Sequence, residues 1–272
     1  MADKKLILEE ISEDEGIAWI TFNRPEKKNA LSRALIAELV GSLEALRHNE
    51  KIRCIVTTGA GDSYSSGRDL YDMREGPEGR RSRADAANAE VVRLLRSCPQ
   101  ITIAAIKGYC LGGGLAVVNG HDLAVAADTA RMGMPEIIRG SYGATATPTL
   151  FHSGIPFKKA FYIQLTGRNL TGLEAERVGL VSLAVPEKEL IPLVRELARE
   201  IASRDPVALE HAKIAAYMEK DMEFHMALRA DDLVAHRMRY YTNPLSDVEG
   251  YMRSQRGGGS SGYVKPERKI RK

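Results

Sequence analysis

Residues 108–136 combine three consecutive glycines with a downstream glutamate, and these residue types suit one kind of chemistry. An apolar, β-branched run at Ile101–Ile106 predicts a strand, which leads to Gly112–Gly114 and then to a short apolar helix predicted at Leu115–Val118. Glycines at such a junction let the backbone approach a ligand closely and leave amide N–H groups at a helix N-terminus. Such donors stabilise an oxygen that becomes negative during a reaction. Glu136, on a Met-Pro-Glu turn, is the candidate for moving a proton beside it; the alternative interpretation is a tight turn with a solvated glutamate.

Two nucleotide-binding patterns are excluded by spacing. A dinucleotide fingerprint would need glycine or alanine three residues after Gly114, where Val117 stands. No stretch has the G-x-x-x-x-G-K-[ST] pattern of a phosphate-binding P-loop. Nucleotide chemistry of either type is therefore not expected.

Composition indicates a globular protein of 272 residues, 44% hydrophobic and 28% charged. A net charge of +3 is too small to argue for nucleic acid, and no apolar run approaches the roughly 20 residues of a membrane span. The first residues have no apolar secretory core, so a cytoplasmic location is expected. Three widely spaced cysteines (54, 98 and 110) predict buried free thiols in a reducing compartment, and six histidines without metal-ligand spacing argue against a metal site.

Periodicity predicts alternating strands and helices in the first 200 residues, and hence an α/β core with stacked sheets. Besides those above, the predicted strands are 6–11, 17–22, 54–58 and 180–185, and the predicted helices are 32–47, 84–95 and 189–203. The charged stretch 74–83 is expected to be a mobile excursion. Two further helices are predicted at 207–220 and 222–241, with large apolar residues that suit packing against the core or a neighbouring subunit.

Five blocks of the sequence resemble the crotonase superfamily of enoyl-CoA hydratases and isomerases. In order from about residue 5 to residue 255, they include ITFNRPEKKNALS, GAGDSYSSGRDL, IAAIKGYCLGGGLA, DLAVAADTARMGMPEI and LTGRNLTGLEAERVGLVSLAVP. The resemblance implies an α/β fold, a crotonase-type spiral of ββα units with a C-terminal helical trimerisation region. The implied division is a core at 1–203, a helical region at 204–256 and a flexible basic tail at 257–272. The implied assembly is a homotrimer or a dimer of trimers.

The resemblance also implies acyl-CoA thioesters as substrates, with coenzyme A present as part of the substrate and no covalently bound cofactor. The backbone N–H groups of Arg68 and Gly113 would hold the thioester oxygen as it becomes an enolate, and Glu136 would be the general acid/base. Coenzyme A would lie across the loops that begin at Asn23 and Ser65. The implied substrate-binding and CoA-binding residues are Lys27, Lys28, Ser66, Gly67, Leu70, Gly112 and Tyr142.

The sequence departs from the hydratase pattern at two places. Ala116 stands where two-glutamate hydratases have their first glutamate, which puts simple hydration in doubt because water addition with the usual pair uses two carboxylates. Downstream, a proline- and glycine-rich segment of the family is replaced by one that contains Tyr142, Thr145 and Thr147. These side chains could orient water or a substrate oxygen, or they could hydrogen-bond backbone groups at the start of a helix; we favour the role at the helix start.

Other acidic and aromatic positions of the family are also altered or are given structural roles. The tyrosines of hydroxycinnamoyl-CoA-cleaving relatives fall on Met73 and Asp232, which disfavours that activity. Asp69 and Asp122 are interpreted as structural.

The predicted function is that of an acyl-CoA enzyme of the hydratase/isomerase type with Glu136 as its single general acid/base. The alternatives are an acyl-CoA hydrolase, a carbon–carbon bond-cleaving relative, and a non-catalytic acyl-CoA-binding protein that kept the fold.

Overall fold

The computed structural model describes residues 5–74, 83–242, 248 and 252, and for residues 73–74 and 83–87 the backbone alone. The chain divides into two compact units, Met1–Arg204 and Asp205–Lys272. The predicted excursion at 74–83 lies, apart from its two end residues, outside the described residues. The predicted linker and basic tail after residue 256 also lie outside them.

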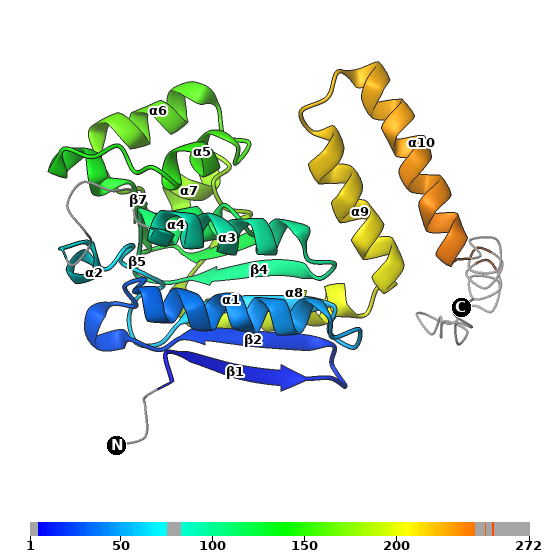
Figure 1. Ribbon diagram of the computed structural model, residues 1–272, viewed down its shortest axis with the longest axis horizontal. Coiled ribbons are helices and arrows are strands. Elements are labelled where there is room, and N and C mark those ends of the chain that lie inside the picture. Colours follow the sequence, from blue (N-terminus) through cyan, green and yellow to red (C-terminus); the bar gives the residue numbers. More distant parts are fainter. Residues whose placement is uncertain (1–4, 75–82, 243–247, 249–251, 253–272) are drawn as a thin grey trace. The chain divides into compact units, whose positions relative to one another are not determined.

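A six-stranded sheet forms the frame of the first unit, in the order β1-β2-β3-β4-β6-β8 (Figure 1). The β1–β2 pair is antiparallel and every other pair in the sheet is parallel. The strands are β1 Ile7–Ser12, β2 Ile17–Phe22, β3 Cys54–Gly59, β4 Ile101–Ile106, β6 Leu123–Ala127 and β8 Leu183–Val185.

The burial of these strands follows their place in the sheet. Every residue of β3 is buried, and all but one residue of β2 and of β4, as expected for parallel strands covered on both faces. In β1, at the edge, only Ile7 is buried. The sequence reflects this difference, because ILEEIS carries two glutamates whereas CIVTTG and ITIAAI carry no charge.

A second, two-stranded parallel sheet pairs β5 (Tyr109–Leu111) with β7 (Arg131–Gly133). An isolated bridge between Ser65 and Cys110 joins a loop after β3 to this sheet. These three short segments position the candidate site described below.

Helices pack around the larger sheet. α8 (Glu187–Ala202) contacts β2, β3, β4 and β6. α1 (Arg33–Arg47) contacts β1 and α3 (Arg83–Ser97), and α3 contacts α4 (Gly113–Val118). α1 begins after Ser32, whose side-chain oxygen accepts the Leu35 N–H at 3.2 Å. The helices of the first unit are η1 Pro25–Lys27, α1 Arg33–Arg47, α2 Leu70–Arg74, α3 Arg83–Ser97, α4 Gly113–Val118, η2 Pro135–Arg139, α5 Ala146–Phe151, α6 Phe157–Thr166, α7 Gly172–Arg177 and α8 Glu187–Ala202.

In the second unit, the described residues include two helices that pack against each other, α9 (Pro206–Glu219) and α10 (Phe224–Tyr241). α9 begins with Pro206 at its first position, and the Asp205 side chain accepts the Ala208 N–H at 2.7 Å.

Most of the predicted elements are confirmed within a few residues, and some predictions are wrong. The glycine-led helix begins at Gly113 rather than at Leu115, because only Gly112 of the three glycines has a non-helical backbone. The strand predicted at 180–185 is confined to Leu183–Val185. β6 was not predicted, since its LAVAA sequence lacks the alternation of a half-buried strand, and β5 and β7 are too short for periodicity to detect.

The three cysteines are buried and none of them forms a disulfide bond, as predicted. Among the described residues, no helix combines the length and the apolar character that crossing a membrane requires.

Candidate active site

The triple glycine and Glu136 meet because β5 and β7 are parallel. Leu111 pairs with Gly133 at the carboxyl ends of the two strands, and the Gly112 N–H donates to the Gly133 carbonyl at 2.9 Å. β5 continues into Gly112 and α4, whereas β7 continues through Met134 into η2, which carries Glu136. Carboxyl ends of parallel strands lie at the same edge of a sheet, so the chain brings the two candidate groups to one place.

The Glu136 carboxylate lies directly against Gly112. A Cβ atom on Gly112 would overlap with Oε1 of Glu136, and Gly112 has a φ of 49°, which favours glycine. Gly143, also at positive φ, borders the carboxylate on another side: a Cβ there would lie 3.3 Å from Cδ of Glu136. Glycines at these two positions leave the room that the carboxylate occupies.

Glu136 has the electrostatics of a proton carrier. Its side chain is half-buried, and its buried Oε2 has no hydrogen-bond partner among the described residues. Burial raises the pKa of the Glu136 carboxyl, and this effect outweighs its own backbone N–H and the charge of Arg139, which act in the opposite direction. A carboxyl group with an unpaired oxygen and a raised pKa is suited to general acid/base chemistry at neutral pH.

The loop after β3 orients the Arg68 amide. Leu31 bridges to Arg68 in parallel: the Leu31 N–H donates to the Gly67 carbonyl at 2.8 Å, and the Asp69 N–H donates to the Leu31 carbonyl at 3.1 Å. In a parallel ladder, the residue that lies between two such hydrogen bonds directs its own N–H away from the partner strand, and here that residue is Arg68. The Arg68 N–H therefore points away from Leu31.

The Arg68 and Gly113 amides belong to adjoining segments. A Cβ on Gly113 would lie 3.4 Å from the Arg68 nitrogen, and a Cβ on Gly67 would lie 3.3 Å from the Gly113 nitrogen. Gly113 is the first residue of α4, so its N–H has no acceptor within the helix. Two backbone amides beside a half-buried carboxylate can hold an oxygen that gains negative charge while a proton moves nearby.

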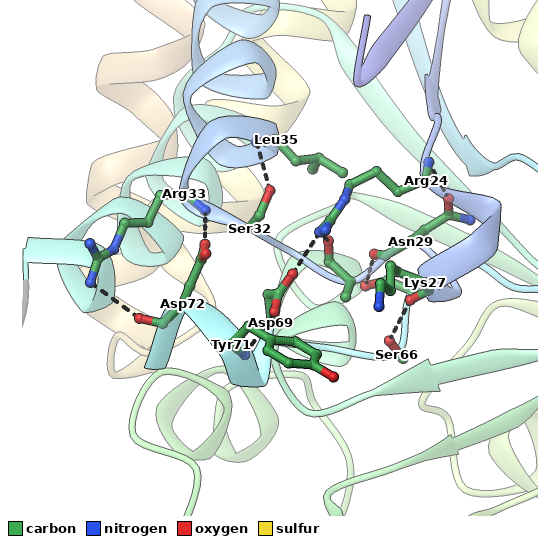
Figure 2. Close-up of polar contacts among 12 residues, drawn as sticks. Arg24, Lys27, Asn29, Ser32, Arg33, Leu35, Ser66, Asp69, Tyr71 and Asp72 are labelled. Carbon is green, nitrogen blue, oxygen red and sulfur yellow. Dashed lines mark hydrogen bonds and ion pairs between the residues drawn. The ribbon is translucent and has the colours of Figure 1, made fainter. Parts of the chain in front are cut away.

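A partly buried ion pair supports the Arg68 segment (Figure 2). Nη1 of Arg24 donates to Oδ2 of Asp69 at 2.9 Å and to the Ala30 carbonyl at 2.7 Å, and Oδ1 of Asp69 accepts the Tyr71 N–H. Burial acts to raise the pKa of the Asp69 carboxyl, but the bonds from Arg24 and Tyr71 outweigh it and hold that pKa below its usual range. Asp69 is thus an ionised anchor next to the Arg68 amide.

The predicted CoA-binding residues gather at the same loops. The Ser66 N–H donates to the Lys28 carbonyl at 2.8 Å and the Ser66 hydroxyl donates to the Lys27 carbonyl at 3.3 Å (Figure 2), so the lysines and the loop that contains Gly67 form one surface. Leu70 is half exposed at the start of α2.

The two lysines differ in their surroundings. Lys28 pairs with Asp62 at 3.0 Å and lies over the Tyr109 ring, whereas Lys27 lies over the Tyr71 ring, 5.1 Å from its centroid. Among the described residues, no carboxylate pairs with Lys27.

Among the new polar side chains after η2, that of Thr147 has structural hydrogen bonds. The Thr147 hydroxyl donates to the Tyr142 carbonyl at 2.7 Å and accepts from Nε2 of Gln164 at 2.7 Å, which supports the interpretation of Thr147 as a helix-start residue. Thr145 precedes α5 but makes no side-chain capping bond. The Tyr142 side chain is exposed, and Tyr142 directly precedes Gly143, the glycine that borders the Glu136 carboxylate.

Ala116 is buried, whereas Asp122 is half-buried. Ala116 lies on α4 with an exposed fraction of 0%. Oδ2 of Asp122 accepts both the N–H and the hydroxyl of Thr102, at 2.7 and 2.9 Å, which accounts for its presence structurally.

The sequence patterns did not identify three contributors to the site: Arg24, Leu31 and Gly143. The Arg24–Asp69 pair joins positions 45 residues apart, and a single sequence carries no signal for such a pairing. Gly143 lay within the segment noted as a departure, but its contact with Glu136 depends on the path of the loop.

Three comparisons relate this geometry to known proteins. Residues 12–250 match the family model described as enoyl-CoA hydratase/isomerase. A hydroxycinnamoyl-CoA hydratase-lyase of Pseudomonas fluorescens is 35% identical over 206 residues, 74% of each chain, and a crotonyl-CoA hydratase of Syntrophomonas wolfei is 31% identical over 238 residues, 85% of this chain and 89% of the relative. The crystal structure of a Mycobacterium smegmatis enoyl-CoA hydratase superposes with a TM-score of 0.86 at 25% identity and covers 92% of this chain and 97% of that one.

Proposed function

Because this chain belongs to the enoyl-CoA hydratase/isomerase family, we propose that it moves a proton on an acyl-CoA thioester, with Glu136 as the single general acid/base. The observation that carries the proposal is the half-buried Glu136 carboxylate, one of whose oxygens has no partner among the described residues, against Gly112 and next to the segment that begins with the Gly113 amide. Coenzyme A enters as part of the substrate.

The proposed steps balance for a 3-enoyl-CoA. Glu136 takes a proton from C2, and the electron pair moves into the thioester carbonyl to give an enolate conjugated with the double bond. The N–H groups of Arg68 and Gly113 hold the enolate oxygen; each such donor typically lowers the barrier by about 3–4 kcal/mol. Glu136 then returns the proton at C4, and the double bond moves to C2–C3.

Ala116 makes this isomerisation a better fit than hydration. Water addition with two carboxylates needs one to hold the water and one to supply the proton, and position 116 offers a buried methyl group instead. Glu136 alone is sufficient for a shuttle of one proton between two carbons.

We therefore expect isomerisation of a 3-enoyl-CoA to be faster than hydration of crotonyl-CoA by the same preparation. Both rates can be followed by the absorbance of the conjugated thioester. In Ala116→Glu the second carboxylate should raise hydration selectively, provided that the buried position admits the longer side chain; Ala116→Gln, which adds similar volume without a carboxylate, is the matched control. Crotonyl-CoA hydration by the native enzyme at least as fast as isomerisation would contradict the single-carboxylate proposal.

A hydratase-lyase reaction is the second candidate, since a relative with 35% identity is named a hydroxycinnamoyl-CoA hydratase-lyase. The side chain of Met73, one of the two positions that disfavour this activity, lies outside the described residues. Incubation with a hydroxycinnamoyl-CoA and chromatography for an aromatic aldehyde distinguishes the two reactions. A non-catalytic acyl-CoA-binding protein would bind every one of these esters without turnover.

We further propose that coenzyme A lies along the surface formed by Lys27, Lys28, Ser66, Gly67 and Leu70, and that the helical region at 204–256 assembles the chain into a trimer or a dimer of trimers. Tyr142 would border the acyl group, because it adjoins the glycine that contacts Glu136. Light scattering on the purified protein measures the assembly directly.

Lys27 should contribute more to CoA affinity than Lys28, because the Lys28 ammonium is already paired with Asp62. Lys27→Ala should weaken CoA binding about 3-fold at low salt, on the scale of one exposed ion pair, and less at high salt. Isothermal titration with CoA and with dephospho-CoA measures the change and identifies the phosphate involved. An equal or larger loss in Lys28→Ala would contradict this assignment.

A further inference from the structure

A chain of buried polar side chains connects the two segments that carry the candidate oxyanion donors. Tyr64, Thr57 and His121 have exposed fractions of 0%, 0% and 7%. Oγ1 of Thr57 lies 2.8 Å from the Tyr64 hydroxyl and 2.8 Å from Nε2 of His121, and Nδ1 of His121 lies 2.8 Å from the Val117 carbonyl. None of the three side chains takes part in the proton transfer proposed above.

With neutral His121, one assignment of protons satisfies the whole chain. The Val117 carbonyl can only accept, so Nδ1 of His121 carries the proton and Nε2 accepts the Thr57 hydroxyl. Thr57 has then used its only proton, and it accepts from the Tyr64 hydroxyl. Each hydroxyl and ring N–H has a partner, which matters because an unpaired buried polar group costs about 1–3 kcal/mol.

The two ends of the chain lead to the two amides. Tyr64 directly precedes the segment Ser65–Arg68, and its own N–H donates to the Lys107 carbonyl at 2.8 Å. Val117 is in the last turn of α4, whose first residue is Gly113. The middle member, Thr57, belongs to β3, between β2 and β4 in the sheet.

The same two segments also contact each other at Ser65. A Cβ on Gly114 would lie 2.9 Å from the Ser65 Cβ, and the Ser65 hydroxyl donates to the Asn29 carbonyl at 2.8 Å and accepts the Gly67 N–H at 3.2 Å. The contact at Ser65 fixes one point of the α4 helix, and the bond to Val117 fixes the other end. Two fixed points define the direction of a helix of six residues and hence the direction of its first N–H.

We propose that Thr57, with Tyr64 and His121, is a positioning residue that holds the Gly113 amide in register with the Arg68 amide. This inference rests on the proposed function, because it assigns the chain to the enolate-binding geometry of that site. Catalysis depends steeply on such geometry: a displacement of about 1 Å costs on the order of 100-fold in rate. CoA affinity, which the loop surface would supply, does not depend on it.

The strand offers a matched control for Thr57. The adjacent Thr58 is also buried, and its hydroxyl donates to the Ala105 carbonyl at 3.0 Å without touching the Tyr64–Thr57–His121 chain. Thr57→Val and Thr58→Val each replace one buried hydroxyl of β3 by a methyl group. Thr57→Ser keeps the hydroxyl. Tyr64→Phe keeps the ring and leaves only the Thr57 hydroxyl oxygen without its donor, so Tyr64→Phe is the test variant if Thr57→Val does not fold.

The experiment measures kcat and KM for a 3-enoyl-CoA together with the near-ultraviolet absorbance of acetoacetyl-CoA, whose enolate a working site should stabilise on binding. Thr57→Val should lower kcat about 10-fold or more and weaken the enolate band, with KM within about 2-fold; Tyr64→Phe should lower kcat about 3-fold. Thr57→Ser and Thr58→Val should retain wild-type kcat, even if Thr58→Val melts at a lower temperature.

The outcomes separate this inference from the proposed function. If the wild-type protein turns over 3-enoyl-CoA and Thr57→Val is no slower than Thr58→Val, the positioning role alone is overturned. If Thr57→Val does not fold, a wild-type kcat in Tyr64→Phe overturns the positioning role instead. A wild-type protein that neither turns over the ester nor develops the enolate band would overturn the proposed function and, with it, this inference.

Discussion

Glu136→Gln should lower turnover of enoyl-CoA substrates about 100-fold or more, while the affinity for the CoA ester stays nearly unchanged. Glutamine keeps the size and polarity of the side chain but cannot exchange a proton, and general acid–base catalysis contributes roughly 100- to 10,000-fold. Steady-state kinetics gives the turnover, and titration with a saturated acyl-CoA gives the affinity. Glu189→Gln, at an exposed glutamate of α8, is the control. Wild-type turnover in Glu136→Gln would refute the assigned role.

The raised pKa of Glu136 also predicts how the same variant changes stability. A carboxyl whose pKa is higher in the folded protein than in the unfolded chain favours folding in its protonated form, and this contribution is lost as pH rises through the folded-state pKa. Above the folded-state pKa the wild type bears a half-buried carboxylate, which the neutral amide of the variant replaces. The melting temperature of Glu136→Gln should therefore exceed that of the wild type at pH 7. This gap between the two melting temperatures should close as pH falls below the pKa of the Glu136 carboxyl in the unfolded chain. A gap that stays constant or widens in acid would contradict the pKa direction.

Gly113→Ala should fold normally and lose most of its activity. A Cβ at this position meets its nearest neighbours, Cγ and N of Arg68 and Cδ1 of Leu31, at 3.4–3.5 Å, which is ordinary van der Waals contact. The added methyl group would occupy the space beside the Arg68 amide, where the thioester oxygen is proposed to lie. Loss of one oxyanion donor costs about 100- to 1,000-fold in kcat, and blocking the space between two should cost at least as much.

Gly41→Ala is the control for this substitution. Gly41 lies inside α1 and a Cβ there meets nothing within 4 Å, so the change should leave activity intact and slightly stabilise the helix. Circular dichroism and thermal melting verify that both variants fold. Normal turnover in Gly113→Ala would mean that the triple glycine serves only the turn between β5 and α4.

The sequence was sufficient to predict the α/β frame, because its central strands are uncharged apolar runs and its helices have apolar faces and, in α1, the capping residue Ser32. The family followed from five ordered blocks of residues, and the match over residues 12–250 confirms it. The short strands β5 and β7 escaped prediction, since three residues cannot establish a period of two.

The geometry of the site could be predicted only in part. The sequence puts the glycines after a predicted strand and Glu136 on a turn, but the contact between Gly112 and Glu136 depends on the parallel pairing of the two unpredicted strands. The Arg24–Asp69 pair and the bond between Thr57 and His121 join residues that lie far apart in the sequence. Such contacts depend on tertiary packing, and neither propensity nor local spacing encodes them.

The central claim, that Glu136 moves a substrate proton against an enolate held by the Arg68 and Gly113 amides, is tested most directly by hydrogen exchange. A 3-enoyl-CoA is incubated with the enzyme in D₂O, and deuterium at C2 and C4 of the recovered esters is measured by mass spectrometry and NMR. The Glu136 carboxyl is only half-buried, so the proton that it has taken from C2 exchanges with D₂O before a proton is returned to C2 or C4. The account therefore predicts incorporation by the wild type and by Glu189→Gln, and at least a 100-fold slower incorporation by Glu136→Gln and by Gly113→Ala. Incorporation by Glu136→Gln at the wild-type rate would contradict it.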